Sequence, residues 1–344
     1  MKDALTDIVG NLALRRRLGD DVLAGKLPHA CILEGPEGTG KHTIAKMTAA
    51  ALVCTAHHDP SLPIPCLRCP PCRKVLEGKS PDVITIGCEG KATIGVDALR
   101  FLKEDVRIVP NDSDSKVYII EDADKLTPQA QNAFLLTLEE PPSYVHFFLL
   151  CKDARMFLET IRSRAPVFRT EPIPTEEIDR YLCEHDRRAA QMKLSDKKGF
   201  EELLMASGMG IGQALAYLEP RTFAPVKQTR ALAAELIRIA IYEEGAKAVF
   251  PLLLRFSNKR DQLHEQLMAV SKSLRDLILL KKSDDAPLIF YADRNEAIEL
   301  CDRTSLGFLY RFHQAVQQAI EENSRNANTR LMLIKMVLSA DLIA

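Results

Sequence analysis

The stretch that decides the fold is residues 116–164, KVYIIEDADKLTPQAQNAFLLTLEEPPSYVHFFLLCKDARMFLETIRSR. It opens with a short apolar run, residues 117–120, which ends at Glu121 and Asp122. Such a run predicts a strand buried in a parallel sheet. Ligands of open parallel sheets bind outside the carboxyl ends of the strands, so we expect the two acids to face a site.

A helix and a second strand are expected directly after these acids. Thr127 is a favourable N-cap and Pro128 a favourable first helical residue, so the helix is predicted to begin there. It should end before Pro141, because the residue that precedes a proline disfavours the helical conformation. The apolar run at residues 145–151 predicts the next buried strand, and the sequence Ile-Arg-Ser-Arg follows at residues 161–164.

A phosphate-binding loop is predicted upstream of this stretch. Residues 31–33 are expected to form the first buried strand, and a helix is expected over residues 43–53. Between them the chain has the spacing Gly-x4-Gly-Lys, in which backbone N–H groups and the lysine bind phosphate. The predicted nucleotide-site residues are Gly35, Gly38, Gly40, Lys41, His42, Thr43, Glu121 and Asp122.

One position of this loop departs from the usual pattern. The residue after the lysine is ordinarily Ser or Thr, whose hydroxyl holds Mg²⁺, but here it is His42. Thr43 is no simple replacement, because one helical residue rotates the side chain by about 100°. The glycines and Lys41 could still bind nucleotide without cleaving it. Side chains that fill the loop could equally block binding, so ATP and Mg²⁺ are doubtful ligands.

Four cysteines predict a metal site in the insert at residues 54–72. Three of them are spaced Cys-x2-Cys-x2-Cys, and zinc prefers four tetrahedral thiolates. Because protein would fill all four positions, the zinc would be structural. The alternative is free thiols in a surface loop, and His57 and His58 are interpreted as bystanders. The predicted zinc ligands are Cys54, Cys66, Cys69 and Cys72.

Composition limits the class of protein. The chain has 344 residues, of which 46% are hydrophobic and 27% charged, so two or three globular domains are expected. A net charge of −1 argues against a basic coat for nucleic acid, and any DNA contact must be local. The N-terminus lacks the apolar core of a signal peptide, and no apolar run approaches membrane-spanning length. We therefore expect a cytoplasmic protein, with cysteines that are reduced or metal-bound.

Strand and helix patterns alternate up to about residue 170, which is typical of a parallel α/β domain, and only helical patterns follow. Three domains are predicted, over residues 1–170, 171–222 and 223–344. One amphipathic helix is expected over residues 1–30. Further helices are expected at about 226–242, 245–256, 259–282, 293–301, 304–322 and from 329 to the end.

The last of these helices has a single apolar stripe. Leu331, Ile334, Leu338 and Leu342 follow one another at helical spacing. Packing within the chain is the plain interpretation of such a stripe. Since six helices in about 120 residues already form a core, part of these faces could instead serve other subunits.

Several of these motifs resemble the subunits of the bacterial DNA polymerase III clamp loader, which belong to the AAA+ family. The resemblance covers nearly the whole chain. It rests on His29-Ala30, the four-cysteine insert, the block Leu-Glu-Glu-Pro-Pro at residues 138–142, Ser163-Arg164 and residues 326–331. It implies an AAA+ nucleotide-fold domain with a zinc insert, a small helical lid and a C-terminal helical collar.

Departures from the family pattern favour the non-motor delta-prime type over the gamma/tau motor type. Phosphoryl transfer needs metal, positioned water and neutralised charge together. Four positions depart from the motor pattern. Glu121-Asp122 stands where the motor has Asp-Glu, and His42 replaces the hydroxyl that holds the metal. The polar-sensor position falls at Cys151 or Lys152, and the sensor-arginine position falls at Gly212. We therefore expect that this chain lacks its own ATPase activity.

Arg164 keeps the family's arginine-finger position. The motif Ser-Arg-Cys occurs here as Ser163-Arg164-Ala165, and the resemblance implies that Arg164 enters a neighbour's nucleotide site. A surface arginine paired with a nearby acid is the alternative. The implied partners are gamma/tau and delta subunits through the collar, and the sliding clamp and primed DNA through the complex, with no membrane partner.

The sequence leaves two alternatives to a non-motor clamp-loader subunit. A motor subunit resembling gamma/tau would itself bind and hydrolyse ATP, with His42 and Glu121 acting in unusual geometry. A stand-alone zinc module for DNA is disfavoured, because no basic stripe with interleaved aromatic residues accompanies the cysteines.

Overall fold

The computed structural model describes residues 4–6, 8–59, 61–88, 93–208, 210–242, 246–325 and 327–342. The chain divides into two compact units, and each is treated by itself. The first unit comprises residues 1–181 and 210–212, and the second comprises residues 182–209 and 213–344. The predicted division into three domains stays a prediction.

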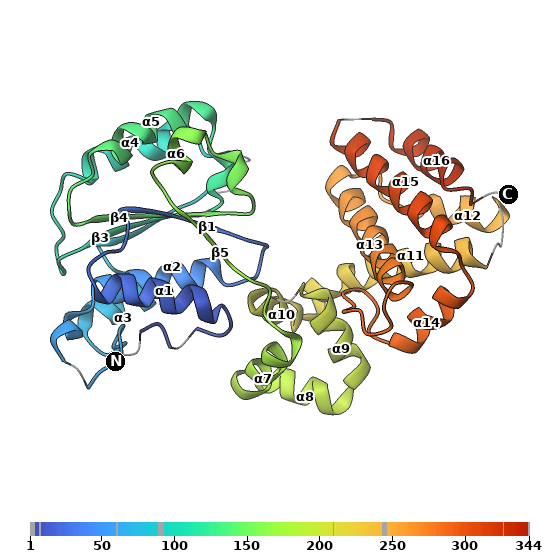
Figure 1. The fold of residues 1–344 in the computed structure, drawn as a ribbon, viewed down its shortest axis with the longest axis horizontal. Helices are drawn as coiled ribbons and strands as arrows, with labels where there is room; N and C mark the ends of the chain where they lie inside the picture. The colour runs from blue at the N-terminus through green and yellow to red at the C-terminus, as the bar shows by residue number, and fades with distance from the viewer. Residues whose placement is uncertain are drawn as a thin grey trace. The chain divides into compact units, whose positions relative to one another are not determined.

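The first unit is built on a five-stranded parallel sheet with the order β2-β3-β4-β1-β5 (Figure 1). Its strands are β1 (Ala30–Glu34), β2 (Val83–Ile86), β3 (Lys116–Ile120), β4 (Val145–Cys151) and β5 (Val167–Arg169). The chain passes from β1 to the far edge, returns through β3 and β4, and then places β5 on the other side of β1. The direction of strand order therefore reverses at β1, where ligands of such sheets bind.

Helices cover both faces of this sheet, because alternate strand residues point to opposite sides. Cys31 and Leu33 pack with Leu18 and Ile44 of the helices on one face. Ile32 packs on the other face. Figure 1 shows α1, α2 and α3 on the first face and α4, α5 and α6 on the second. These helices are α1 (Leu12–Leu23), α2 (Lys41–Leu52), α3 (Pro70–Leu76), α4 (Val96–Asp105), α5 (Pro128–Glu139) and α6 (Glu159–Arg162).

The local signals for α5 act as predicted. The hydroxyl of Thr127 accepts a hydrogen bond of 3.2 Å from the N–H of Ala130, which caps the helix, and Pro128 is the first helical residue. Phe134 of α5 is buried. The centre of its ring lies 5.2 Å from the centre of the Phe147 ring, in an edge-to-face arrangement. This contact fixes α5 on the sheet.

Other predicted boundaries are wrong. The first helix is much shorter than residues 1–30, because Gly10 and Asn11 have positive φ and α1 begins only at Leu12; residues 1–3 and 7 lie outside the described residues. The helix after the phosphate loop begins at Lys41 rather than at residue 43. Sequence reasoning missed α3 and the three-residue strand β5.

The helices that follow the sheet are α7 (Thr175–His185), α8 (Arg187–Ser195), α9 (Lys197–Ala206), α10 (Ile211–Tyr217), α11 (Pro220–Ile241), α12 (Ala246–Leu253), α13 (Arg260–Leu280), α14 (Arg294–Asp302), α15 (Leu306–Ser324) and α16 (Thr329–Ser339). In the second unit α13 packs against both α11 and α15, and α16 packs on α15. No helix in the described part of the chain is long and apolar enough to cross a membrane.

The stripe predicted on the last helix faces outward for most of its length. Leu331 is 67% exposed, Ile334 37% and Leu338 61%, and only Leu342, beyond the end of α16, is buried. The core side of α16 consists instead of Met332, Leu333, Met336 and Val337. Of the two interpretations of this stripe, packing within the chain holds for Leu342, whereas Leu331 and Leu338 are left exposed because α16 is apolar on more than one side.

Candidate functional site

The predicted phosphate loop lies at the carboxyl end of β1 and leads into α2. Gly38 has φ of 82° and Gly40 of 86°, which only glycine adopts without strain. The loop is tied to its surroundings by Thr39, whose hydroxyl lies 2.8 Å from the Pro36 carbonyl and 2.7 Å from the Thr170 hydroxyl. The loop therefore has a defined conformation, set partly by a residue far away in sequence.

Lys41 binds the loop itself. Its Nζ donates hydrogen bonds of 2.6 Å to the carbonyls of Gly35 and Pro36. Burial lowers the pKa of this lysine. In a working phosphate loop the lysine reaches the terminal phosphates, whereas here two of its three donors are used by carbonyl groups of the loop.

His42, at the position where Ser or Thr is usual, contacts an acid. His42 follows Lys41 at the start of α2, and its Nε2 lies 3.0 Å from a carboxylate oxygen of Glu121, at the end of β3. The two side chains are 49% and 42% exposed, so the pair contributes at most about 1 kcal/mol to stability. The contact does, however, engage both His42 and the carboxylate at the end of β3.

The remaining predicted nucleotide-site residues contribute less. Asp122 has φ of 48° and pairs with Lys125 at 2.9 Å rather than with the loop. Thr43 is exposed on α2. Cys151 is buried at the end of β4, and its burial raises the pKa of the thiol to about 12. Lys152 pairs with Glu37 at 3.0 Å.

A segment from beyond the sheet lies against the loop. A Cβ placed on Gly210 would come within 2.7 Å of the backbone of Gly38, so no other residue fits at position 210 without movement. Asn11 also reaches the loop, since its Nδ2 donates to the Thr39 carbonyl at 3.3 Å. Sequence reasoning missed Asn11, Thr39, Thr170 and Gly210. The glycines around residue 210 were the one available signal.

Arg164 lies just after α6 and away from these residues. Its guanidinium donates to the Thr160 carbonyl at 3.0 Å and lies 3.3 Å from a carboxylate oxygen of Glu139, at the end of α5. The side chain is 40% exposed. An exposed arginine held by one weak ion pair can exchange that acid for another anion at little cost.

The four predicted metal ligands come together beside α2 and α3. The Sγ atoms of Cys54, Cys66, Cys69 and Cys72 all lie within 4.8 Å of one another, so they form a cluster able to hold a metal ion. The Sγ of Cys54 accepts hydrogen bonds of 3.4 Å from the N–H groups of Ala56 and Cys66, which orient it within the cluster.

This donor set fits zinc in its chemistry. Four sulfur atoms from protein complete a tetrahedral site, three of the four cysteines are buried, and no position is left for water. His57 bonds the Ala51 carbonyl through Nε2 at 2.8 Å. The side chain of His58 lies outside the described residues.

Comparison with known proteins identifies the relatives of the first unit. Residues 11–174 match the family described as "DNA polymerase III, delta subunit". This part of the chain is therefore similar to the DNA polymerase III subunits that the family describes. The first unit is a parallel α/β domain with a four-cysteine insert.

Curated relatives match mainly over the same unit. The chain is 36% identical to the tau subunit of Bacillus subtilis over 172 residues, which are 50% of this chain and 30% of that protein. It is 31% identical to the gamma subunit of Buchnera aphidicola from Schizaphis graminum, over 51% of this chain and 47% of that protein. It is 30% identical to Escherichia coli tau, over 59% and 33%. The chain thus spans less than half of these relatives.

Among solved structures, a gamma-subunit-related protein of Thermotoga maritima is similar with a TM-score of 0.48 and 18% identity. The similarity covers 94% of this chain and 98% of that one.

Proposed function

We propose that this chain is a delta-prime-type stator subunit of the clamp loader, which assists ATP-dependent loading of the sliding clamp onto primed DNA without hydrolysing ATP itself. The observation that carries this proposal is the use of Lys41 and His42 by the chain's own groups. Lys41 binds two loop carbonyls and His42 pairs with Glu121. Phosphoryl transfer requires both a free lysine and a metal site.

The proposed contribution of this chain to catalysis is Arg164. In the assembled loader it would leave Glu139 and enter the nucleotide site of a neighbouring gamma/tau subunit. An arginine supplied in trans stabilises the charge that spreads over the transferred phosphoryl group. Its exposure and its single weak acidic partner support this role.

Substitution of Arg164 in the reconstituted complex tests this role. Arg164→Ala should leave the complex assembled and lower its DNA-stimulated ATP turnover by at least about tenfold at the affected site, because trans arginines contribute about 10³–10⁵ in rate. The matched control is Arg162→Ala, two residues earlier on α6 and also exposed. Unchanged turnover in Arg164→Ala, with intact assembly, would refute the finger assignment.

The proposed route of assembly is the exposed face of α16. Leu331 and Leu338 are each more than 60% exposed on a helix whose other side is buried in the core. Exposed apolar faces of this kind mark protein interfaces. The implied partners are the gamma/tau and delta subunits, and contact with the clamp and DNA would be made through the complex.

A motor role is the second candidate, and the identity of 30–36% to gamma and tau subunits favours it. It would require Lys41 to leave the loop carbonyls and the His42–Glu121 pair to open around Mg²⁺. A third possibility is that the chain binds nucleotide without hydrolysing it, which requires only that Lys41 leave the loop carbonyls. Hydrolysis and binding measured on the isolated chain separate the three.

A further inference from the structure

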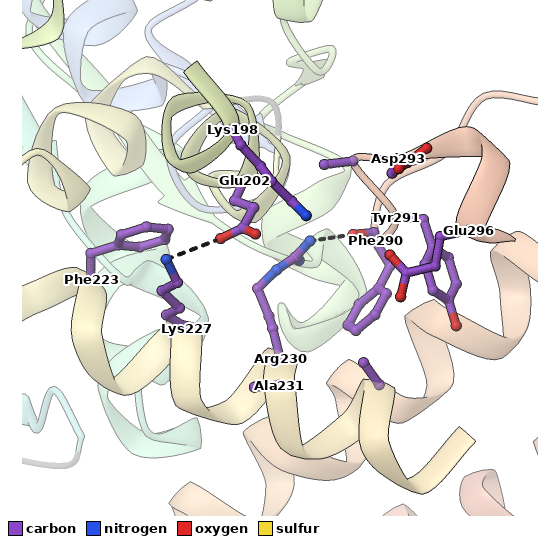
Figure 2. A pocket seen from close by; sticks show the side chains of 12 residues that line it. Lys198, Glu202, Phe223, Lys227, Arg230, Ala231, Phe290, Tyr291, Asp293 and Glu296 are labelled. Atoms are coloured by element: carbon purple, nitrogen blue, oxygen red, sulfur yellow. Dashed lines mark hydrogen bonds and ion pairs between the residues drawn. The ribbon is translucent and has the colours of Figure 1, made fainter. Parts of the chain in front are cut away.

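A second charged site lies in the helical unit, around Arg230 of α11. Arg230 lines two cavities of about 280 Å³ each. Its guanidinium lies 4.6 Å from the centre of the Phe290 ring and donates a hydrogen bond to the Phe290 carbonyl, as Figure 2 shows. The described part of the chain gives this guanidinium no ion pair with a carboxylate.

The position of Phe290 is itself fixed by a buried acid. Asp276 of α13 is fully buried, and one of its carboxylate oxygens accepts hydrogen bonds from the N–H groups of Ile289, Phe290 and Tyr291, at 2.9, 2.7 and 3.3 Å. Three N–H donors on one oxygen hold this segment firmly. Phe290 therefore provides a rigid support for the guanidinium of Arg230.

The two cavities differ in their charges. In the cavity of Figure 2, Lys198, Lys227 and Arg230 face three acids, and Lys227 pairs with Glu202 at 3.4 Å. Arg230 also lines the second cavity, so when its charge is assigned there the cavity of Figure 2 has one acid more than it has lysines. The second cavity has Arg230, Lys272 and His264 with a single acid, Glu265. Positive charge is in excess there.

The positive charge of Lys272 is not neutralised by a neighbouring acid among the residues that the structure describes. Like Arg230, it forms no ion pair with a carboxylate in the described residues. Partial burial and the nearby charge of Arg230 lower the pKa of Lys272, and burial lowers the pKa of Arg230. Both side chains line one cavity, and two like charges that repel each other are stabilised when an anion joins them.

We propose that this second cavity binds a phosphate group, either free or carried by a small ester such as a nucleotide. The guanidinium of Arg230 and the ammonium of Lys272 would share the phosphate oxygens, an arrangement that both side chains favour. The walls add the hydroxyl of Thr229 and the rings of Tyr217 and Phe290, against which a flat group could pack. The volume is close to the lower limit for small-molecule sites, about 300 Å³.

Calorimetric titration of the full chain tests this proposal. The probes are inorganic phosphate, pyrophosphate and adenosine monophosphate, at low salt. Saturable binding to the wild type is expected, with an affinity at least about tenfold lower in Lys272→Met and in Arg230→Gln. Lys272→Met is the primary variant, because methionine keeps the length of the apolar stem and removes only the charge of the lysine. Tighter binding of the monophosphate ester than of phosphate would identify an ester ligand, and equal binding would identify free phosphate.

Two controls separate this site from others. Lys247→Met removes an exposed lysine of the same unit that does not line the cavity, and Lys41→Met alters the phosphate loop of the first unit. Both should bind like the wild type. The proposal is overturned if the wild type binds no phosphate probe, if Lys272→Met binds as well as the wild type, or if Lys41→Met alone loses binding. Tighter binding of a tetraglutamate peptide than of any phosphate would also overturn it, and would make the cavity a protein contact.

Discussion

At the scale of single residues, the side chains of Lys41 and His42 contact groups of the chain itself. Lys41 donates to two carbonyls at 2.6 Å, and His42 faces Glu121 at 3.0 Å. In this arrangement Lys41 contributes to the stability of the loop.

The stability of a Lys41→Met variant tests this contribution. The variant loses two charge-assisted hydrogen bonds, so the free energy of unfolding should fall by about 1–2 kcal/mol. Turnover by the reconstituted complex should not change, since no nucleotide is expected to depend on this lysine. Denaturant unfolding and ATPase assays measure the two effects, with Lys26→Met, at an exposed site, as the control. A variant of unchanged stability that slows turnover would show instead that Lys41 serves a nucleotide.

The cysteine cluster also depends on individual residues. We expect about one zinc ion per chain, bound by Cys54, Cys66, Cys69 and Cys72. Cys72→Ser should release the metal and lower the melting temperature, because Cys72 is fully buried beside α2. Elemental analysis and thermal melts are the measurements, and Cys88→Ser, outside the cluster, should keep its zinc. Protein purified without chelator that contains no zinc would contradict the prediction.

At the scale of elements, some parts of the fold could be read from the sequence and others could not. The strands β3 and β4 are mainly apolar, and α5 has both a capping threonine and a first-turn proline, so local chemistry alone predicts them. By contrast β5 has only three residues, and their pairing with β1 is what makes them a strand. The polar helix α8 buries only Ala189, so it carries no apolar period to detect.

The candidate site shows the same limit. Its residues could be predicted from spacing, because glycines and a lysine between a strand and a helix have a specific role. Their contacts could not, since the bond between Thr39 and Thr170 joins residues 131 positions apart. The side-chain direction of Lys41 likewise depends on packing that no local pattern encodes.

The exposed face of α16 makes a prediction about assembly. Leu338→Glu places a charge on an apolar patch that is 61% exposed, so the isolated chain should keep its stability within about 0.5 kcal/mol. Association with gamma/tau and delta subunits should weaken by at least about tenfold, since burial of an unpaired charge is costly. Size-exclusion chromatography of the mixed subunits measures assembly. Gln314→Glu, at an exposed position of α15, is the matched control, and normal assembly of Leu338→Glu would exclude this face as the interface.

At the scale of the whole molecule, the two units divide the proposed work. The first keeps a nucleotide-binding scaffold, with its strand reversal at β1, its loop and its metal cluster. The second supplies a large helical core and an apolar outer face. This division agrees with the proposal of a non-motor subunit that supplies Arg164 to the nucleotide site of a neighbour.

ATP hydrolysis by the purified chain alone tests the central claim most directly. The chain should show no Mg²⁺-dependent turnover above background, because Lys41 and His42 are already engaged by the chain itself. The gamma/tau subunit assayed under the same conditions is the positive control. Turnover by the lone chain at a rate comparable with that of gamma/tau, abolished by Lys41→Met, would contradict the claim.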